Sequence, residues 1–297
     1  MNQEKWLKYA TYASVFVSVS LVIVKLIIWM YSGSVSLMAS LVDSLMDVAA
    51  SVINLFAVRY ALKPADDDHR FGHGKMESLA GLAQASFIAG SGVFLLTEAI
   101  RRIVNPEAIE HAGLALIVMS ISLVATLLLV AFQTYVLNKT QSVAIKADRV
   151  HYLTDIATNL GIILALGLAY WGWAAADPII ALLIAGFILY GAWEIGRESI
   201  DLLMDKELDA ETIEKIVNIV RDVEGVKGLH DLKTRKSGRD IFMQMHVDLD
   251  PTLVLADAHE IAEIVEAKLL REFPHSEILI HQDPFENPHA EIEYRVF

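Results

Sequence analysis

Two pairs of ionisable residues with the same spacing lie in two different apolar segments of the chain. Asp43 and Asp47 are four residues apart in one segment, and His151 and Asp155 are four residues apart in the other. Residues at this spacing lie one turn apart on one face of a helix. Three carboxylates and one imidazole suit a divalent ion of the zinc, iron or manganese type in four-coordinate geometry. We therefore predict that the two pairs form one metal site.

Ionisable side chains inside a membrane are costly and usually serve a function. The alternative is that the pairs cap helix ends or hydrogen-bond between helices, and the repetition of the pair makes this the weaker interpretation. Another polar residue in an apolar segment, Lys25, is interpreted as a side chain that snorkels to the membrane interface.

Two further groups of potential metal ligands lie outside the apolar segments. A loop group would gather around one ion if the chain turns at Gly72, and a C-terminal group is spread over the last third of the sequence. On spacing alone, a solvated charged loop and scattered surface histidines explain these two groups about equally well. The members of the loop group are Asp66, His69 and His73, and those of the C-terminal group are His230, His246, His259, His281 and Asp283.

Composition places the chain among membrane proteins. Of its 297 residues 55% are hydrophobic, and the mean hydropathy is +0.45. A bilayer-spanning helix needs about 20 mostly apolar residues. Segments of this kind occur at residues 9–31, 36–62, 77–102, 111–138, 142–171 and 177–203. Because charges appear throughout the chain after residue 204, we predict a six-helix transmembrane domain over 1–206 and a cytoplasmic domain over 207–297.

The C-terminal domain is predicted to be a small α/β unit. Helices are expected over 210–223 and 255–273, and strands over 226–234, 240–248 and 277–281. This α-β-β-α-β order favours two helices on one face of a small sheet. Alternation along the second strand places His246 and Asp248 on one face and Met243 and Met245 on the other. Beyond Pro284 a loose tail is expected.

Charge and cysteine content exclude several classes of function. The net charge of −13 argues against a nucleic-acid partner, and most of the excess lies from Lys206 to the end, with 11 Lys and Arg against 20 Asp and Glu. The absence of cysteine excludes disulfides, thiolate ligands and a cysteine nucleophile. The Lys and Arg residues that flank the apolar segments fall mostly on one side of the membrane, which predicts that both termini are cytoplasmic.

Three motifs around these residues resemble the cation diffusion facilitator family, especially its bacterial zinc and ferrous-iron efflux members. They are Ser40-Leu-Val-Asp43-Ser-Leu-Met-Asp47, Phe71-Gly-His73-Gly-Lys75 and His151-Tyr-Leu-Thr-Asp155, and the resemblance covers nearly the whole chain. It implies a multi-pass homodimer of the inner membrane, in contact with lipid, that is not an enzyme. Such a protein would export Zn2+, and also Cd2+ or Fe2+, in exchange for protons.

The resemblance also implies a role for each group of residues. Asp43, Asp47, His151 and Asp155 match the transport site, and Asp66, His69 and His73 match a loop metal site. The C-terminal group, including His259, matches a two-metal site in a metallochaperone-like domain, where Zn2+ would be regulatory. Lys75 and Asp205 match a charge pair that locks the membrane domains at the dimer interface.

The chemistry of the ligands agrees with exchange of metal for protons. Carboxylates and imidazole bind metal only when deprotonated, so protons and metal compete for the same atoms. His151 is the expected proton carrier because imidazole titrates near physiological pH.

Two other classes of function are an intramembrane metalloenzyme and a membrane-anchored metal sensor. A site with four protein ligands leaves no open position for a catalytic water, which argues against the metalloenzyme. Six membrane spans that carry polar residues are more than a sensor needs as an anchor.

Overall fold

The computed structural model of the chain describes residues 3–32, 35–104, 112–170 and 176–285. Within the helices some side chains lie outside this description, among them that of Asp43. The residues after Phe285, where a loose tail is predicted, are also outside it. The chain divides into two compact units, Met1–Ile200 and Asp201–Phe297.

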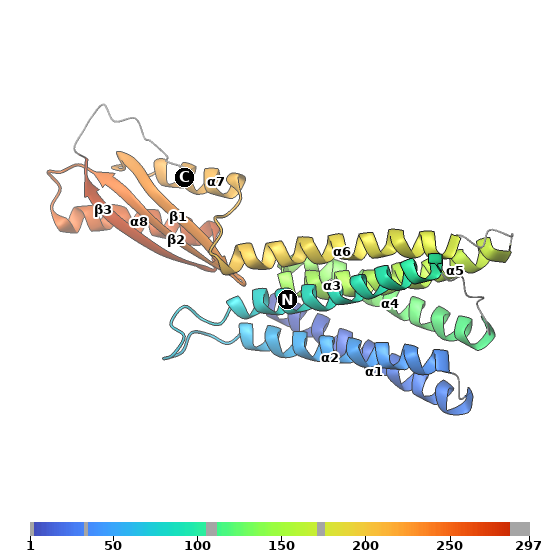
Figure 1. The fold of residues 1–297 in the computed structure, drawn as a ribbon. Coiled ribbons are helices and arrows are strands. Elements are labelled where there is room, and N and C mark those ends of the chain that lie inside the picture. Colours follow the sequence, from blue (N-terminus) through green and yellow to red (C-terminus); the bar gives the residue numbers. More distant parts are fainter. Residues whose placement is uncertain (1–2, 33–34, 105–111, 171–175, 286–297) are drawn as a thin grey trace. The chain divides into compact units, whose positions relative to one another are not determined.

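The first unit contains long helices at each of the predicted apolar segments (Figure 1). Five of them, within the described residues, are long and apolar enough to cross a membrane; α5 instead carries Lys146, Asp148, Arg149 and Asp155 in its first half. Their bounds are α1 (Gln3–Ser32), α2 (Val35–Ala61), α3 (Lys75–Val104), α4 (Ala112–Thr140), α5 (Val143–Tyr170) and α6 (Ala176–Leu203). Helix α1 begins six residues before the predicted segment, because its polar first turns continue the helix beyond the apolar run.

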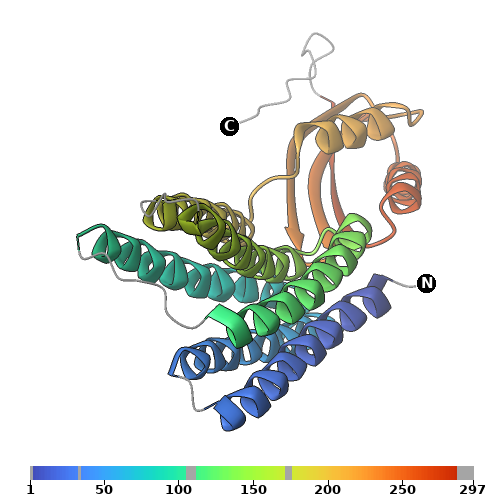
Figure 2. The same cartoon turned by 90° about the vertical axis from the view of Figure 1, so that its right-hand side faces the viewer.

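The long helices run side by side (Figure 2). Helix α2 contacts α5. Helix α1 packs against α2 and α4, and α3 packs against α2 and α5. Helix α6 joins through buried aliphatic residues shared with α3 and α5. Gly161 of α5 makes a close approach possible, since a Cβ there would lie 2.2 Å from Ile184 Cδ1 of α6.

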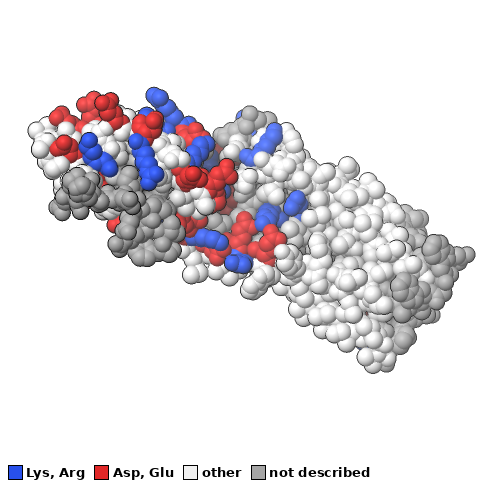
Figure 3. All heavy atoms as spheres, turned by 90° about the horizontal axis from the view of Figure 1, so that it is seen from above, with Lys and Arg blue, Asp and Glu red and all other residues white. Residues whose placement is uncertain are grey.

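The surface of the helical unit is largely free of charge in the view of Figure 3. The long helices expose large apolar side chains such as Phe16, Phe94, Leu128 and Leu183. An exposed apolar surface of this extent is typical of helices that face lipid. In the same view, acidic and basic side chains gather over the α/β unit.

The second unit has the predicted α-β-β-α-β order. Its elements are α7 (Ala210–Arg221), β1 (Gly228–Ser237), β2 (Asp240–Leu249), α8 (Leu255–Glu272) and β3 (Ser276–Pro284). The sheet order is β1-β2-β3, with β1 antiparallel and β3 parallel to β2. Helix α8 supplies the crossover that a parallel pair needs. At the start of α7, Asp209 accepts a hydrogen bond from the Thr212 backbone N at 2.9 Å and caps the helix.

Alternation along β2 separates a core face from an open face. Met243, Met245, Val247 and Leu249 are buried together with apolar residues of α7 and α8, so both helices cover the same face. The residues between them, His246 among them, therefore lie on the opposite face.

A bulge in β1 determines which of its side chains lie on the core face and which on the open face. The register shifts between His230 and Lys233, and Asp231 adopts a φ of +48°. The additional residue lets both Leu229 and Leu232 reach the core while His230 stays opposite His246. The bulge thus determines where His230 points.

Truncation of the buried Leu269 of α8 tests this core. Leu269→Ala removes a fully buried side chain and should cost about 2–5 kcal/mol of stability. The control Leu255→Ala, on the same helix, removes a side chain that is 81% exposed and should change stability by less than about 0.5 kcal/mol. Thermal unfolding of the purified chain in detergent measures both, and equal midpoints for the two variants would contradict the packing.

Candidate metal centres

Helices α2 and α5 bring three of the four predicted intramembrane ligands together. One ligand atom each from Asp47, His151 and Asp155 lies within 4.8 Å of the other two. His151 Nε2 is 3.1 Å from Asp47 Oδ1, and the two side chains are only 11% and 15% exposed. Asp43 stands one turn before Asp47 on α2, with its side chain outside the described residues.

This arrangement is chemically suited to a divalent cation. The donors are two carboxylates and an imidazole, a set that zinc and similar ions accept, and the atoms are close enough to share one ion. A carboxylate and an imidazole that are largely removed from solvent need a positive charge or a proton between them. The i, i+4 spacing of His151 and Asp155 puts both side chains on the face of α5 that meets Asp47 of α2.

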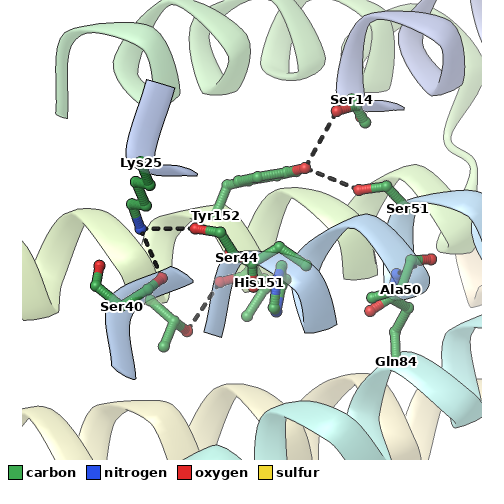
Figure 4. Close-up of polar contacts among 12 residues, drawn as sticks. Ser14, Lys25, Ser40, Ser44, Ala50, Ser51, Gln84, His151 and Tyr152 are labelled. Atoms are coloured by element: carbon green, nitrogen blue, oxygen red, sulfur yellow. Dashed lines mark hydrogen bonds and ion pairs between the residues drawn. The ribbon is translucent and has the colours of Figure 1, made fainter. Parts of the chain in front are cut away.

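The helix that carries His151 is fixed by the neighbouring Tyr152. Tyr152 is almost fully buried, and its hydroxyl lies 2.8 Å from Ser51 Oγ on α2 and donates to the Ser14 backbone oxygen on α1 at 3.4 Å (Figure 4). Residue spacing does not indicate this role, because a tyrosine in an apolar helix resembles any other packed aromatic residue. Its hydrogen bonds join three helices around the site.

A buried carboxylate forms a second polar cluster one turn before His151. Asp148 Oδ2 accepts hydrogen bonds from Ser14 Oγ at 2.5 Å and from Gln133 Nε2 at 2.7 Å. Asp148 is completely buried, and its partners come from α1 and α4. Sequence analysis missed this cluster although Asp148 is three residues from His151, because Ser14 is 134 positions away.

The loop after α2 gathers Asp66, His69 and His73, as predicted for a turn at Gly72, whose φ is +76°. Asp66 Oδ1 is 3.3 Å from His69 Nδ1, and Asp66 Oδ2 is 3.3 Å from His73 Nε2. The pKa of Asp66 lies below its ordinary value, mainly because the backbone N–H of His69 donates a hydrogen bond to its carboxylate. His73 is buried, and its ring nitrogens form no hydrogen bond within the described part of the chain. An orphaned buried imidazole beside an ionised carboxylate fits a metal ligand.

The sheet of the second unit aligns three histidines in one row. His230 is paired with His246 across β1 and β2, and His246 with His281 across β2 and β3. Asp283 joins the row: its Oδ2 is 2.7 Å from His246 Nδ1 and 3.5 Å from His230 Nε2, while its Oδ1 is 3.2 Å from His281 Nε2. One carboxylate thus faces imidazoles with both of its oxygens.

Electrostatics keep Asp283 ionised. Partial burial raises its pKa, but the hydrogen bond with His246 and the nearby imidazoles of His281 and His230 outweigh burial, so the pKa lies below its ordinary value. Asp248, which sequence analysis did not select, is 3.4 Å from His230 Nδ1. Its alternation with His246 on the same strand face was the available signal.

The remaining predicted residues are not members of these clusters. His259 is exposed on α8, where its Nε2 is 3.5 Å from Glu263 Oε1, and it is not in the group formed by His230, His246 and Asp283. Lys75 is the first residue of α3 in one unit. Asp205 belongs to the other unit and lies 3.4 Å from Arg235. The charge pair between Lys75 and Asp205 stays a prediction.

Two family models match the chain. Residues 11–204 match the cation efflux transmembrane domain, and residues 208–285 match the cytoplasmic domain of cation efflux proteins. Among solved structures, the chain is similar to a nickel form of MamM CTD, at 31% identity over 26% of this chain and 99% of that chain, with a TM-score of 0.24.

Curated relatives match along almost the entire chain. A cation-efflux pump FieF of Klebsiella pneumoniae is 47% identical over 286 residues, which cover 96% of this chain and 95% of that protein. FieF pumps of Citrobacter koseri and Escherichia coli are 46% identical with the same coverage. The chain therefore belongs to the cation diffusion facilitator family of cation-efflux proteins, within its FieF type, and it is a transporter of divalent metal cations rather than an enzyme.

Proposed function

We propose that this transporter exports Zn2+ from the cytoplasm in exchange for protons, with Cd2+ and Fe2+ as further cargo. Asp43, Asp47, His151 and Asp155 bind the cargo. The observation that carries the proposal is the convergence of Asp47, His151 and Asp155, from helices far apart in sequence, to within 4.8 Å. A single imidazole among carboxylates favours zinc-type ions over harder cations such as manganese.

Coupling to protons follows from the same ligands. Each must be deprotonated to bind metal, so a proton that reaches the site displaces the cargo. His151 is the proposed proton carrier, because imidazole changes charge near physiological pH. The short contact between His151 and Asp47 provides a place for a proton when no metal is bound.

The clusters outside the helical bundle are proposed as further zinc sites. Asp66, His69 and His73 form the loop site. His230, His246, His281 and Asp283 form the core of a two-metal site, since Asp283 faces imidazoles with both oxygens and could bridge two ions. His259 lies on α8 away from this group, so it joins the site from a second subunit or after a rearrangement.

The assembly is proposed to be a homodimer in the inner membrane with both termini cytoplasmic. Lys and Arg flanking the helices support this orientation. Lys75 and Asp205 form the proposed charge pair at the dimer interface. Zinc bound in the second unit would stabilise the dimer and adjust transport to the cytoplasmic metal concentration.

Zinc flux in proteoliposomes with an encapsulated zinc-sensitive dye tests the function. We expect zinc flux that a pH gradient drives and a proton ionophore abolishes. Asp47→Ala should reduce it by more than the roughly 10–100-fold that loss of a supporting residue costs. The control Asp67→Ala removes an equally acidic side chain, 95% exposed and paired with Arg70, and should leave the flux unchanged. Flux that ignores the pH gradient contradicts antiport, and no flux at all would indicate a sensor.

Replacement of the imidazole tests the selectivity of the site. His151→Asp should lower the preference for zinc over manganese, because a carboxylate is a harder ligand than imidazole. Side-by-side flux assays with zinc, iron and manganese measure the change. An unaltered ratio of zinc to manganese flux would refute a role for His151 in selectivity.

A double variant at the histidine row tests regulation. The double variant His230→Ala with Asp283→Ala deletes a terminal and a bridging ligand, and should abolish the stabilisation of the dimer by zinc and the dependence of flux on cytoplasmic metal. Thermal shift and crosslinking with and without zinc report the first effect. His275→Ala, an exposed histidine outside the row, serves as control. The idea fails if the double variant responds to zinc as the wild type does.

A further inference from the structure

Lys25 of α1 does not snorkel, contrary to the interpretation from sequence. Its side chain is 8% exposed and points to α2. The ammonium donates hydrogen bonds to Ser44 Oγ at 2.6 Å and to the Ser40 backbone oxygen at 3.2 Å (Figure 4). A buried positive charge on the last third of α1 therefore contacts the first turns of α2.

The place where Lys25 binds α2 is the turn that carries the cargo ligands. Ser40 and Ser44 are the two ends of one helical turn, and Asp43 lies within it. Ser44 also precedes Asp47 by three residues, a spacing that puts their side chains on neighbouring positions of one face. The ammonium therefore contacts α2 at Ser44, three residues before Asp47 of the cluster.

The contacts of Lys25 do not neutralise its charge. Within the described residues its hydrogen-bond partners are uncharged oxygens, and a buried ammonium without a counter-charge is costly. With metal bound, the three carboxylates of the proposed transport site would carry three negative charges, one more than the positive charge of a divalent cargo balances. One fixed ammonium balances the remaining charge.

We propose that Lys25 is a resident cation of the transport site, which balances one of its carboxylates and weakens the binding of cargo. This inference rests on the proposed transport site and adds a residue that does not touch the metal. Repulsion between Lys25 and the cargo grows with the charge of the ion. It keeps affinity low enough for the ion to leave again, as transport requires.

A simpler explanation is that Lys25 only latches α1 to α2. The two explanations predict opposite signs. Loss of a latch loosens the turn that holds Asp43 and weakens metal binding, whereas loss of a repelling charge strengthens it. The hydrogen bond to Ser44 can be removed separately from the charge, so the two contributions can be distinguished.

The test is zinc binding to the full chain in detergent, by competition with a chromophoric chelator. Asp66→Ala and Asp283→Ala are introduced as background, so that the loop and the sheet clusters do not dominate. The pH is kept well above the ordinary pKa of imidazole, where protons compete least. Lys25→Met should bind zinc roughly tenfold or more tightly, and its flux should show a lower half-saturating concentration together with a lower maximal rate.

Matched variants separate the charge from the contact. Lys25→Arg keeps the charge and should bind zinc as the wild type does, and Ser44→Ala should also stay close to wild type. Lys8→Met, which removes another lysine from α1, should change nothing. If Lys25→Met does not fold, Lys25→Gln removes the charge while keeping a hydrogen-bond donor, and the same tightening is expected.

Unchanged or weaker zinc binding in both charge-removing variants overturns the proposal. Failure of the transport site itself is seen independently: Asp47→Ala in the same background would then bind zinc as tightly as its parent. In that case the proposed function fails, whatever Lys25 does.

Discussion

The structure depends on the cost of holding charge inside an apolar helix bundle. A divalent cation can rest there only between deprotonated ligands, and those ligands are themselves costly to bury. Asp47, His151 and Asp155, the ligands proposed for this role, lie within reach of each other because α2 and α5 bring them together. The helices that pack against α2 and α5 therefore help to set where these ionisable side chains lie. The buried polar residues of the bundle thus act together.

Hydrogen bonds around the site show how the bundle maintains that arrangement. Tyr152 joins α5 to α1 and α2, and the Asp148 cluster joins α5 to α1 and α4. Buried polar groups with partners specify one packing of the helices, since any shift would leave them unsatisfied. Any rearrangement of these helices must therefore either move them together or break these hydrogen bonds.

In the second unit a β-sheet brings potential metal ligands together, as helices α2 and α5 do in the first unit. The register of β1, β2 and β3 places His230, His246 and His281 in one row, and the bulge at Asp231 keeps the first of them in line. Because α7 and α8 cover the other face, the row stays accessible to solvent metal. Asp283, whose pKa is lowered and which faces imidazoles with both oxygens, concentrates negative charge beside three potential ligands on this face.

The sequence by itself determined the long apolar helices, the α-β-β-α-β order and the ligand pairs, because hydrophobic length and i, i+4 spacing are local properties. The tertiary structure alone decided which distant groups meet. Tyr152 with Ser51, Asp148 with Ser14, and Lys25 with Ser44 are contacts between different helices, and no periodicity encodes them. Likewise, the separation of His259 from the histidine row follows from how α8 packs on the sheet, since sequence order cannot tell which histidines share a face.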